Sequence, residues 1–210
     1  MNLWDLLETL VFKPLPTHLL LTIGALIISI FISIPLASLC VYNKKLASII
    51  ISFANLVQAI PSFAILAIVV PFLGIGFTPA IFAIILRALL PIIKNTYVGL
   101  STIDESTIQY AEGVGLTEFQ ILRYIRFPNA YPAIFSGIKF AAILANSIAI
   151  LTAMIGSGGF GTNVFKYIHQ YNIPNLIYSI IPVIIIAIFI EFVLTILEKK
   201  FTPQPLRNKI

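Results

Sequence analysis

The chain has 210 residues, of which 59% are apolar and 10% are charged, whereas a soluble domain typically carries about 25% charged residues. These proportions exclude an ordinary water-soluble fold, because apolar blocks of this length cannot be buried inside so small a globule. The net charge of +5 does not indicate nucleic-acid binding, because the Lys and Arg residues form no basic stripe interleaved with aromatic residues. Cys40 is the only cysteine, so we expect no internal disulfide and interpret it as a packed apolar residue.

The N-terminal residues do not have the pattern of a cleaved secretory signal. Asp5 and Glu8 stand where such a signal carries positive charge, and no small-residue cleavage site follows the first apolar run. We therefore interpret the first apolar block as a retained membrane span.

Five apolar segments are long enough to cross a bilayer core of about 30 Å, which takes about 20 helical residues. These segments cover residues 19–42, 46–73, 79–98, 133–155 and 176–197. Pro61 predicts a bend or a break in the second and longest of them. The sequence therefore predicts an all-α integral membrane protein, with five transmembrane helices in a single domain over residues 1–210.

Positive charges are concentrated in one set of connections between these spans. That set and the C-terminal tail hold Lys44, Lys45, Arg123, Arg126, Lys199, Lys200, Arg207 and Lys209, with Lys94 and Lys139 at its margins. The opposite set holds only Lys13 and Lys166. The positive-inside rule therefore predicts that the N-terminus lies outside, that the C-terminus is cytoplasmic and that residues 99–132 form a cytoplasmic loop.

Two short helices are predicted in this loop, because capping-box spacing occurs there twice. Thr102 is followed by Glu105, and Thr117 is followed by Gln120.

Glycine and proline predict where these short helices end. Gly113 and Gly115 predict a turn after the first helix, and Pro128 predicts the end of the second. The second helix has one apolar face, formed by Phe119, Leu122 and Ile125. Periodicity alone also fits an amphipathic segment lying on the bilayer surface.

The loop has a more specific pattern in the order of its residues. Gln109, Tyr110, Ala111, Gly115, Ile125, Phe127 and Pro128 match the spacing Glu-Ala-Ala, three residues, Gly, nine residues, Ile, one residue, Leu-Pro. This pattern resembles the EAA loop of binding-protein-dependent ABC importer permeases. Gln109 replaces the usual Glu, Tyr110 the first Ala, and Phe127 the Leu.

The resemblance implies a type I importer fold and a coupling helix that docks on a cytoplasmic ATPase dimer. The residues implied in this coupling are Gln109, Tyr110, Ala111, Glu112, Gly113, Gly115, Ile125, Phe127 and Pro128. It also implies a second permease subunit, identical or related, an extracytoplasmic substrate-binding protein, and a bacterial or archaeal inner membrane. No cofactor is implied for this chain, since ATP and Mg are used by the ATPase.

Three further stretches make the resemblance narrower. QAIPS, ALLPIIKNTY and IGSGGFG are most similar to permease subunits of osmoprotectant importers, which carry quaternary amines such as glycine betaine, choline and carnitine. A methionine-type amino-acid importer permease is the nearest alternative. An ATP-independent channel or secondary carrier, and a membrane scaffold without transport activity, are alternatives from other classes.

Motifs that suggest other chemistry lack the necessary context. Gly156, Gly158 and Gly161 spell G-x-G-x-x-G, but they follow a predicted membrane helix instead of a strand, so we expect a tight extracytoplasmic turn. The sequence contains no P-loop motif, so ATP binding is assigned to a separate subunit. His18 and His169 have no Cys, Asp or Glu at ligand spacing, and no metal site or catalytic triad is predicted.

The charges predicted inside spans belong to Arg87 and Glu191, and each needs a partner in the membrane. Our hypothesis is that they pair, within one subunit or across a dimer; the alternative is that each faces a water-filled cavity. The candidates for the substrate path are Asn55, Gln58, Ser62, Asn146 and Ser147. Such polar side chains also serve as hydrogen-bonding contacts between helices.

Overall fold

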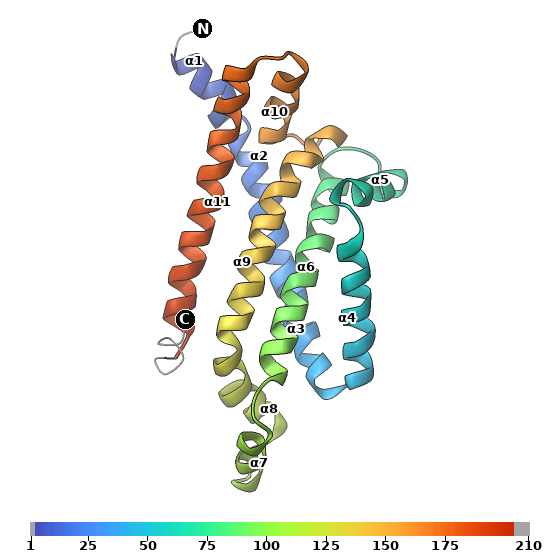
Figure 1. The fold of residues 1–210 in the computed structure, drawn as a ribbon, viewed down its shortest axis with the longest axis vertical. Coiled ribbons are helices and arrows are strands. Elements are labelled where there is room, and N and C mark those ends of the chain that lie inside the picture. Colours follow the sequence, from blue (N-terminus) through green and yellow to red (C-terminus); the bar gives the residue numbers. More distant parts are fainter. Residues whose placement is uncertain (1–2, 204–210) are drawn as a thin grey trace.

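A computed structural model describes residues 3–203, without the side chains of Leu3 and Leu6, and every regular element in that range is a helix (Figure 1). In chain order the elements are α1 (Leu3–Leu7), η1 (Glu8–Phe12), α2 (Leu15–Leu19), η2 (Leu20–Gly24), α3 (Ala25–Tyr42), α4 (Lys44–Ala59), α5 (Ser62–Leu73), α6 (Phe77–Ser101), α7 (Glu105–Gly113), α8 (Glu118–Ile121), η3 (Leu122–Arg126), α9 (Phe127–Leu151), η4 (Thr152–Ile155), α10 (Phe160–His169) and α11 (Ile173–Phe201).

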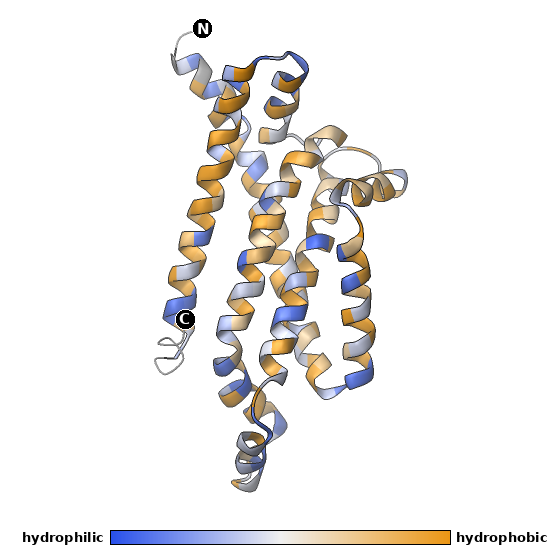
Figure 2. Ribbon diagram, viewed as in Figure 1, coloured by the Kyte–Doolittle hydropathy of each residue, from blue (hydrophilic) through white to orange (hydrophobic). Residues whose placement is uncertain are grey.

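Four continuous helices in the described range are long and apolar enough to cross a membrane. They are Glu8–Tyr42, Phe77–Ser101, Glu118–Ile155 and Ile173–Phe201. Apolar residues cover most of the length of these helices (Figure 2). The helices extend beyond the predicted spans because the first and third of them continue through turns of π-helix and 3-10 helix, whose backbone groups stay hydrogen-bonded within the helix.

The second predicted span corresponds to a bent pair, α4 and α5, whose axes differ by 102° and which are long and apolar enough to cross a membrane only together. Ile60 and Pro61 at the bend have ψ angles of 128° and 140°, because a residue before proline is disfavoured in the helical region. The predicted bend at Pro61 is confirmed. α5 consequently lies across the end of the bundle, while α4 runs along it (Figure 1).

The centre of the bundle is α6, which packs against α3 on one side and α9 on the other. Gly137 of α9 allows this close approach, since a Cβ atom there would lie 2.9 Å from the carbonyl oxygen of Pro91. Ile92, Ile134 and Ala141 are buried in the same contact. Small residues at helix contacts are what membrane helices need, because in lipid they associate by van der Waals packing and not by exclusion of water.

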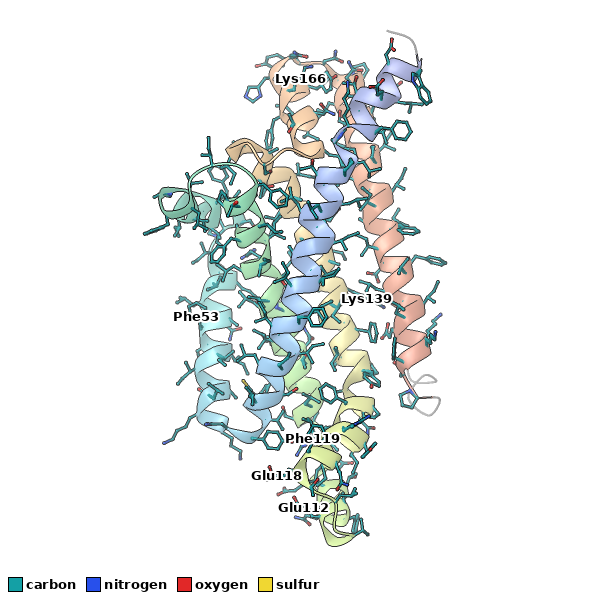
Figure 3. The ribbon with its side chains drawn as sticks, turned by 180° about the vertical axis from the view of Figure 1, so that it is seen from behind. Phe53, Glu112, Glu118, Phe119, Lys139 and Lys166 are labelled. Atoms are coloured by element: carbon teal, nitrogen blue, oxygen red, sulfur yellow. The ribbon has the colours of Figure 1, made fainter. Side chains whose placement is uncertain are left out.

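The two predicted sets of positive charge lie at opposite ends of the molecule. Lys44 starts α4, Arg126 ends η3 and Lys200 is near the end of α11, and these element ends lie on the side of α7 (Figure 1). Lys166, a residue of α10, lies at the other end of the molecule (Figure 3). Arg207 and Lys209 lie outside the described residues. The structure thus separates the charges as the positive-inside prediction requires, while which end is cytoplasmic stays a prediction.

The prediction that Pro128 ends the second loop helix is wrong. The helix that starts at Glu118 continues through η3 into α9, and Pro128 is placed in the first turn of α9. The wide turn of η3, in which the Phe127 amide donates to the Leu122 carbonyl, gives the proline ring the room that a regular helix lacks. Phe119 is exposed, whereas Leu122 packs against the core, so the two do not form one exposed apolar face.

The predicted capping box at Thr102 is also wrong. The helix α7 begins after Asp104, without a side-chain cap. The Thr102 hydroxyl instead donates to the carbonyl of Val98, one turn back in α6. A threonine can satisfy its hydroxyl on its own preceding turn in this way, and it is then not available as a cap. The second predicted capping box is confirmed, because Thr117 and Gln120 exchange side-chain and backbone hydrogen bonds.

Candidate coupling site and intramembrane polar groups

The helix α7 ends in a tight glycine turn at the tip of the molecule. The amide of Gly115 donates to the Glu112 carbonyl at 2.9 Å, and the amide of Leu116 donates to the Ala111 carbonyl at 3.1 Å. These two bonds form the Schellman motif, which needs a residue with positive φ, and Gly115 has φ of +86°. The predicted turn at Gly113 and Gly115 is confirmed.

Large apolar side chains are exposed on this tip. Tyr110 is 76% exposed, Val114 is 79% exposed and Phe119 is 67% exposed. The tip projects beyond the bundle, with Glu112 toward its outer end and Glu118 and Phe119 closer to the bundle (Figure 3). An apolar patch of this kind outside the membrane-spanning region is typical of a protein-binding surface. Sequence reasoning missed Val114, which lies in the three-residue spacer of the motif.

The base of the tip is held to two spans by hydrogen bonds. The hydroxyl of Tyr42, at the end of α3, donates to the Glu118 carbonyl at 3.2 Å. Nη1 of Arg126 donates to the Leu100 carbonyl near the end of α6 at 2.6 Å. Because α8 also runs without a break into α9, the tip is attached to three spans, α3, α6 and α9.

The residues of the coupling motif therefore separate into two groups. The exposed group consists of Gln109, Tyr110, Glu112, Gly113 and Gly115. The buried or half-buried group consists of Ala111, Ile125, Phe127 and Pro128. The first group is exposed on the tip, whereas Phe127 in the second group packs against the core of the bundle.

Arg87 holds the bend of the broken span. Its Nη1 atom donates to the carbonyls of Val57, Gln58 and Ile60 at 3.2, 3.2 and 3.0 Å. These carbonyls belong to the last turn of α4 and to the bend, where Pro61 has no amide hydrogen to donate to the Val57 carbonyl. The Val57 carbonyl also accepts from the Ile60 amide at 3.2 Å. A guanidinium is suited to this place, because it carries several donors and favours the negative end of the helix dipole.

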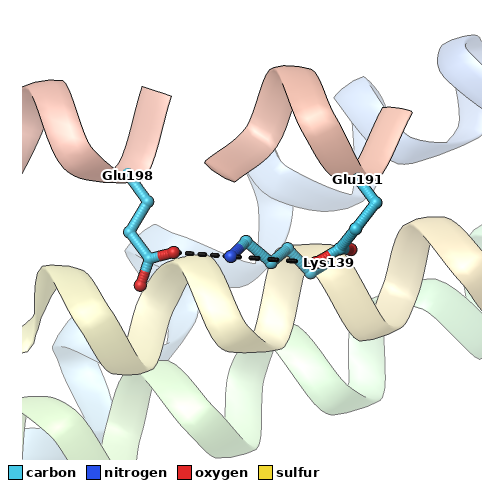
Figure 4. Close-up of polar contacts among 3 residues, drawn as sticks. All are labelled: Lys139, Glu191 and Glu198. Carbon is cyan, nitrogen blue, oxygen red and sulfur yellow. Dashed lines mark hydrogen bonds and ion pairs between the residues drawn. The ribbon is translucent and has the colours of Figure 1, made fainter. Parts of the chain in front are cut away.

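Glu191 has a different partner, Lys139 of α9 (Figure 4). The Lys139 Nζ atom lies 2.5 Å from Oε2 of Glu198 and 3.8 Å from Oε1 of Glu191. The side chains of Lys139, Glu191 and Glu198 are 19%, 45% and 8% exposed. The closer pair is also the more buried, and it fastens α11 to α9.

The hypothesis that Arg87 pairs with Glu191 within one subunit is therefore wrong, since each has its own partners. A usable signal was the seven-residue spacing of Glu191 and Glu198, which places both carboxylates on one face of α11. The partner is a cation on the neighbouring helix, Lys139, which lies inside α9 and not at the margin of a connection as the charge distribution predicts. Pairing between Arg87 and Glu191 across a dimer stays a hypothesis.

The five candidates for the substrate path are in different environments. Asn146 is buried, with its Oδ1 atom 3.0 Å from Nε2 of His18 and its Nδ2 donating to the Val183 carbonyl. It joins the first helix, α9 and α11, as the alternative interpretation proposed. Asn55 is exposed and accepts from Nζ of Lys94 at 3.3 Å.

The other three candidates lie at the bend and on the open face of α9. Gln58 and Ser62 flank the bend and are half-buried, and Ser147 is exposed on α9. Ser147 donates to the carbonyl of Ile143, one turn earlier. Ile143 lines a cleft of about 580 Å³ beside Glu191.

The glycine motif after the fourth span forms the tight turn that was predicted. Gly156 and Gly158 have φ of +79° and +84°, and the chain turns there from η4 toward α10. His18 lies behind this turn, edge-on to the ring of Phe160 with 5.1 Å between ring centroids. Among the described residues, no group of three or more His, Cys, Asp or Glu side chains is placed to hold a metal ion.

Comparison with known proteins gives a family match over most of the chain. Residues 15–205 match the family described as the inner membrane component of binding-protein-dependent transport systems. The carnitine transport permease protein OpuCB of Listeria monocytogenes is 36% identical over 91% of this chain and 88% of that protein. The choline transport system permease protein OpuBB of Bacillus subtilis has the same identity and coverage. The osmoprotectant import permease protein OsmW of Salmonella typhimurium is 33% identical over 90% of this chain and 91% of that protein.

Solved structures agree at the level of the fold. A chain in an inward-facing structure of the MetNI methionine ABC transporter superposes with a TM-score of 0.86. The match covers 97% of this chain and 100% of that one, at 21% sequence identity. An amino acid ABC transporter matches with a TM-score of 0.71 at 15% identity. The chain therefore belongs to the family of inner membrane components of binding-protein-dependent transport systems.

Proposed function

We propose that this chain is the permease subunit of an ATP-binding cassette importer for a small quaternary amine osmoprotectant of the glycine betaine, choline or carnitine type. It works with a cytoplasmic ATPase dimer, a second permease subunit and an extracytoplasmic binding protein. The chain itself is not an enzyme, since ATP and Mg belong to the ATPase. Its place is the inner membrane of a bacterium or archaeon.

The observation that carries the solute class is the set of relatives at 32% to 36% identity, over about nine-tenths of this chain, whose names specify carnitine, choline or osmoprotectants. The methionine transporter has the same fold at 21% identity, which supports the architecture without favouring methionine. The test is uptake of radiolabelled glycine betaine, choline, carnitine and methionine in cells that carry the complete importer and lack other routes. Uptake of methionine alone would support the alternative.

The exposed tip formed by α7 and the Gly115 turn is the proposed docking element for the ATPase. Its apolar side chains supply the contact, and its attachment to α3, α6 and α9 transmits the movement to the spans. Replacing Tyr110 by Ser removes apolar contact area without disturbing the core, because that side chain is exposed. We expect loss of ATPase co-purification and of ATP-driven uptake.

A matched control for this substitution is Tyr171→Ser, which changes an even more exposed tyrosine (89%) just before α11, at the opposite end of the molecule. This variant is expected to retain the ATPase. Uptake that persists in the Tyr110→Ser variant under ATP depletion would contradict the proposal and favour a channel or secondary carrier.

The solute path is proposed to follow the open face of α9 that carries Ile143 and Ser147. A cysteine at Ser147, in a chain with Cys40 replaced by Ala, is expected to react with a water-soluble thiol reagent and to be protected by the solute. Phe31→Cys is the control, because Phe31 is an exposed residue of a different helix, α3. Equal reaction at both positions would place Ser147 outside an aqueous path.

A further inference from the structure

An apolar groove runs between the first long helix (Glu8–Tyr42) and α11, on the side of the molecule seen in Figure 3. It consists of two pockets of about 360 and 470 Å³ that share Leu15, Ile185 and Ile186 in their walls. The two helices are close at the α10 end and separate toward the α7 end (Figures 1 and 3). The pocket walls consist of residues between Leu7 and Leu26 and of residues of α11, and none of them is charged.

The dimensions of the groove match those of a bilayer. Its shared walls, Ile185 and Ile186, lie near the midpoint of α11. The smaller pocket extends from Ile186 to Tyr178, a length of about 12 Å along the helix axis. The larger pocket extends in the opposite direction, from Ile185 to Leu194, a length of about 14 Å. Each length is close to half of a bilayer core of about 30 Å, so each pocket corresponds to the hydrocarbon of one leaflet.

The apolar walls of the groove suit an acyl chain as its occupant. Its walls are aliphatic stripes at helical spacing, including Leu15, Leu19 and Ile23 on the first helix. Such walls contact a narrow hydrocarbon chain along its whole length.

Charge at the α7 end indicates which head group belongs to the larger pocket. Lys200 follows Val193, a residue of the pocket wall, by seven residues and therefore lies on the same face of α11. It lies about 10 Å beyond Val193 along the axis, and both Lys199 and Lys200 are exposed. A cation just beyond the hydrocarbon attracts the phosphate of an anionic lipid.

We propose that this groove is a binding site for a phospholipid, with an acyl chain in the larger pocket and an anionic head group at Lys199 and Lys200. This site goes beyond the transport function and depends only on insertion of the chain in a membrane. The phospholipid fills the wedge where the first helix and α11 separate toward the α7 end (Figures 1 and 3).

The test uses the purified importer complex in detergent supplemented with phosphatidylglycerol or phosphatidylcholine, with bound lipid counted by native mass spectrometry. Ile185→Trp blocks the groove where the two pockets meet and is expected to reduce retained phospholipid at least five-fold. Ile184→Trp is the matched control, because Ile184 is also exposed but is not part of the pocket walls. Thermal melting of both variants shows whether they are equally folded.

The head-group site is tested with Lys200→Gln. This variant is expected to weaken phosphatidylglycerol binding about five-fold, because one cation near an anionic head group contributes about 1 kcal/mol. Binding of phosphatidylcholine is expected to stay unchanged. Equal lipid retention by Ile185→Trp and Ile184→Trp would overturn the site. Formation of a disulfide between two copies that carry Ile185→Cys would also overturn it, because a second chain would then cover the groove. Neither result depends on which solute is transported.

Discussion

Two glycines, two positions apart in the sequence, show how one backbone angle controls the coupling tip. Gly113 and Gly115 both have open space where a Cβ atom would be, but only Gly115 has a positive φ. We therefore predict that Gly115→Ala costs about 1–2 kcal/mol of turn stability, because an L-residue is strained in this region. The measurements are solute uptake and the number of ATP molecules hydrolysed per solute transported. We expect the Gly115→Ala variant to continue hydrolysing ATP while it takes up less solute.

Gly113→Ala is the control for this prediction, since it adds the same methyl group at a helical angle. It is expected to leave coupling unchanged or to stabilise α7 slightly. Normal coupled uptake in the Gly115→Ala variant would show that the turn does not have to be tight.

Among the helices, the broken span depends on a side chain from its neighbour. Arg87 of α6 supplies the donor for three carbonyls at the end of α4. Replacing Arg87 by Met leaves these carbonyls without that donor, and we predict that the free energy of unfolding falls by about 2–4 kcal/mol. The basis is that each hydrogen bond to a charged group contributes about 1.5–3 kcal/mol, while the three bonds here share one nitrogen atom. Hydrogen exchange at residues 57–61 is the measurement, with faster exchange expected.

Leu86→Met is the control in the same turn of α6, because a leucine-to-methionine change nearly conserves volume. If Arg87→Met exchanged no faster at the bend than Leu86→Met, the side chain of Arg87 would not hold the bend.

The contact between α9 and α11 gives a second prediction about elements. Glu198 is nearly buried and lies 2.5 Å from Lys139, whereas Glu191 is half exposed at 3.8 Å. We predict that Glu198→Gln lowers the free energy of unfolding by about 2–3 kcal/mol, and that Glu191→Gln changes it by less than about 1 kcal/mol. Thermal melting in detergent compares the two, and equal losses would show that depth of burial does not decide the energy.

The whole molecule separates its positive charges between two ends, and this separation predicts its orientation. A cysteine at Gly113, in α7, and a cysteine at Thr162, in α10, lie at opposite ends of the bundle. In intact cells we predict that a membrane-impermeant maleimide labels Thr162→Cys, and labels Gly113→Cys only after permeabilisation. The reverse pattern would invert the topology and remove the proposed contact with a cytoplasmic ATPase.

Much of this architecture could be predicted from the sequence, because it depends on local properties of the chain. The length of each apolar segment, the bend at Pro61, the turn at Gly115 and the cap at Thr117 follow from hydropathy or from one residue's backbone preference. The spacing within residues 109–128 likewise identified the family, which the match over residues 15–205 supports.

Only the tertiary structure decided which side chains meet, because partners in a bundle come from helices distant in sequence. Lys139 and Glu198 are 59 residues apart, and Arg87 donates to a bend about 27 residues earlier; neither contact follows from periodicity. The passage of α8 through a π-helical turn into α9 was equally hidden, since proline usually ends a helix unless a wider turn makes room for its ring. Hydropathy therefore determined what crosses the membrane, and packing determined how the crossings are held together.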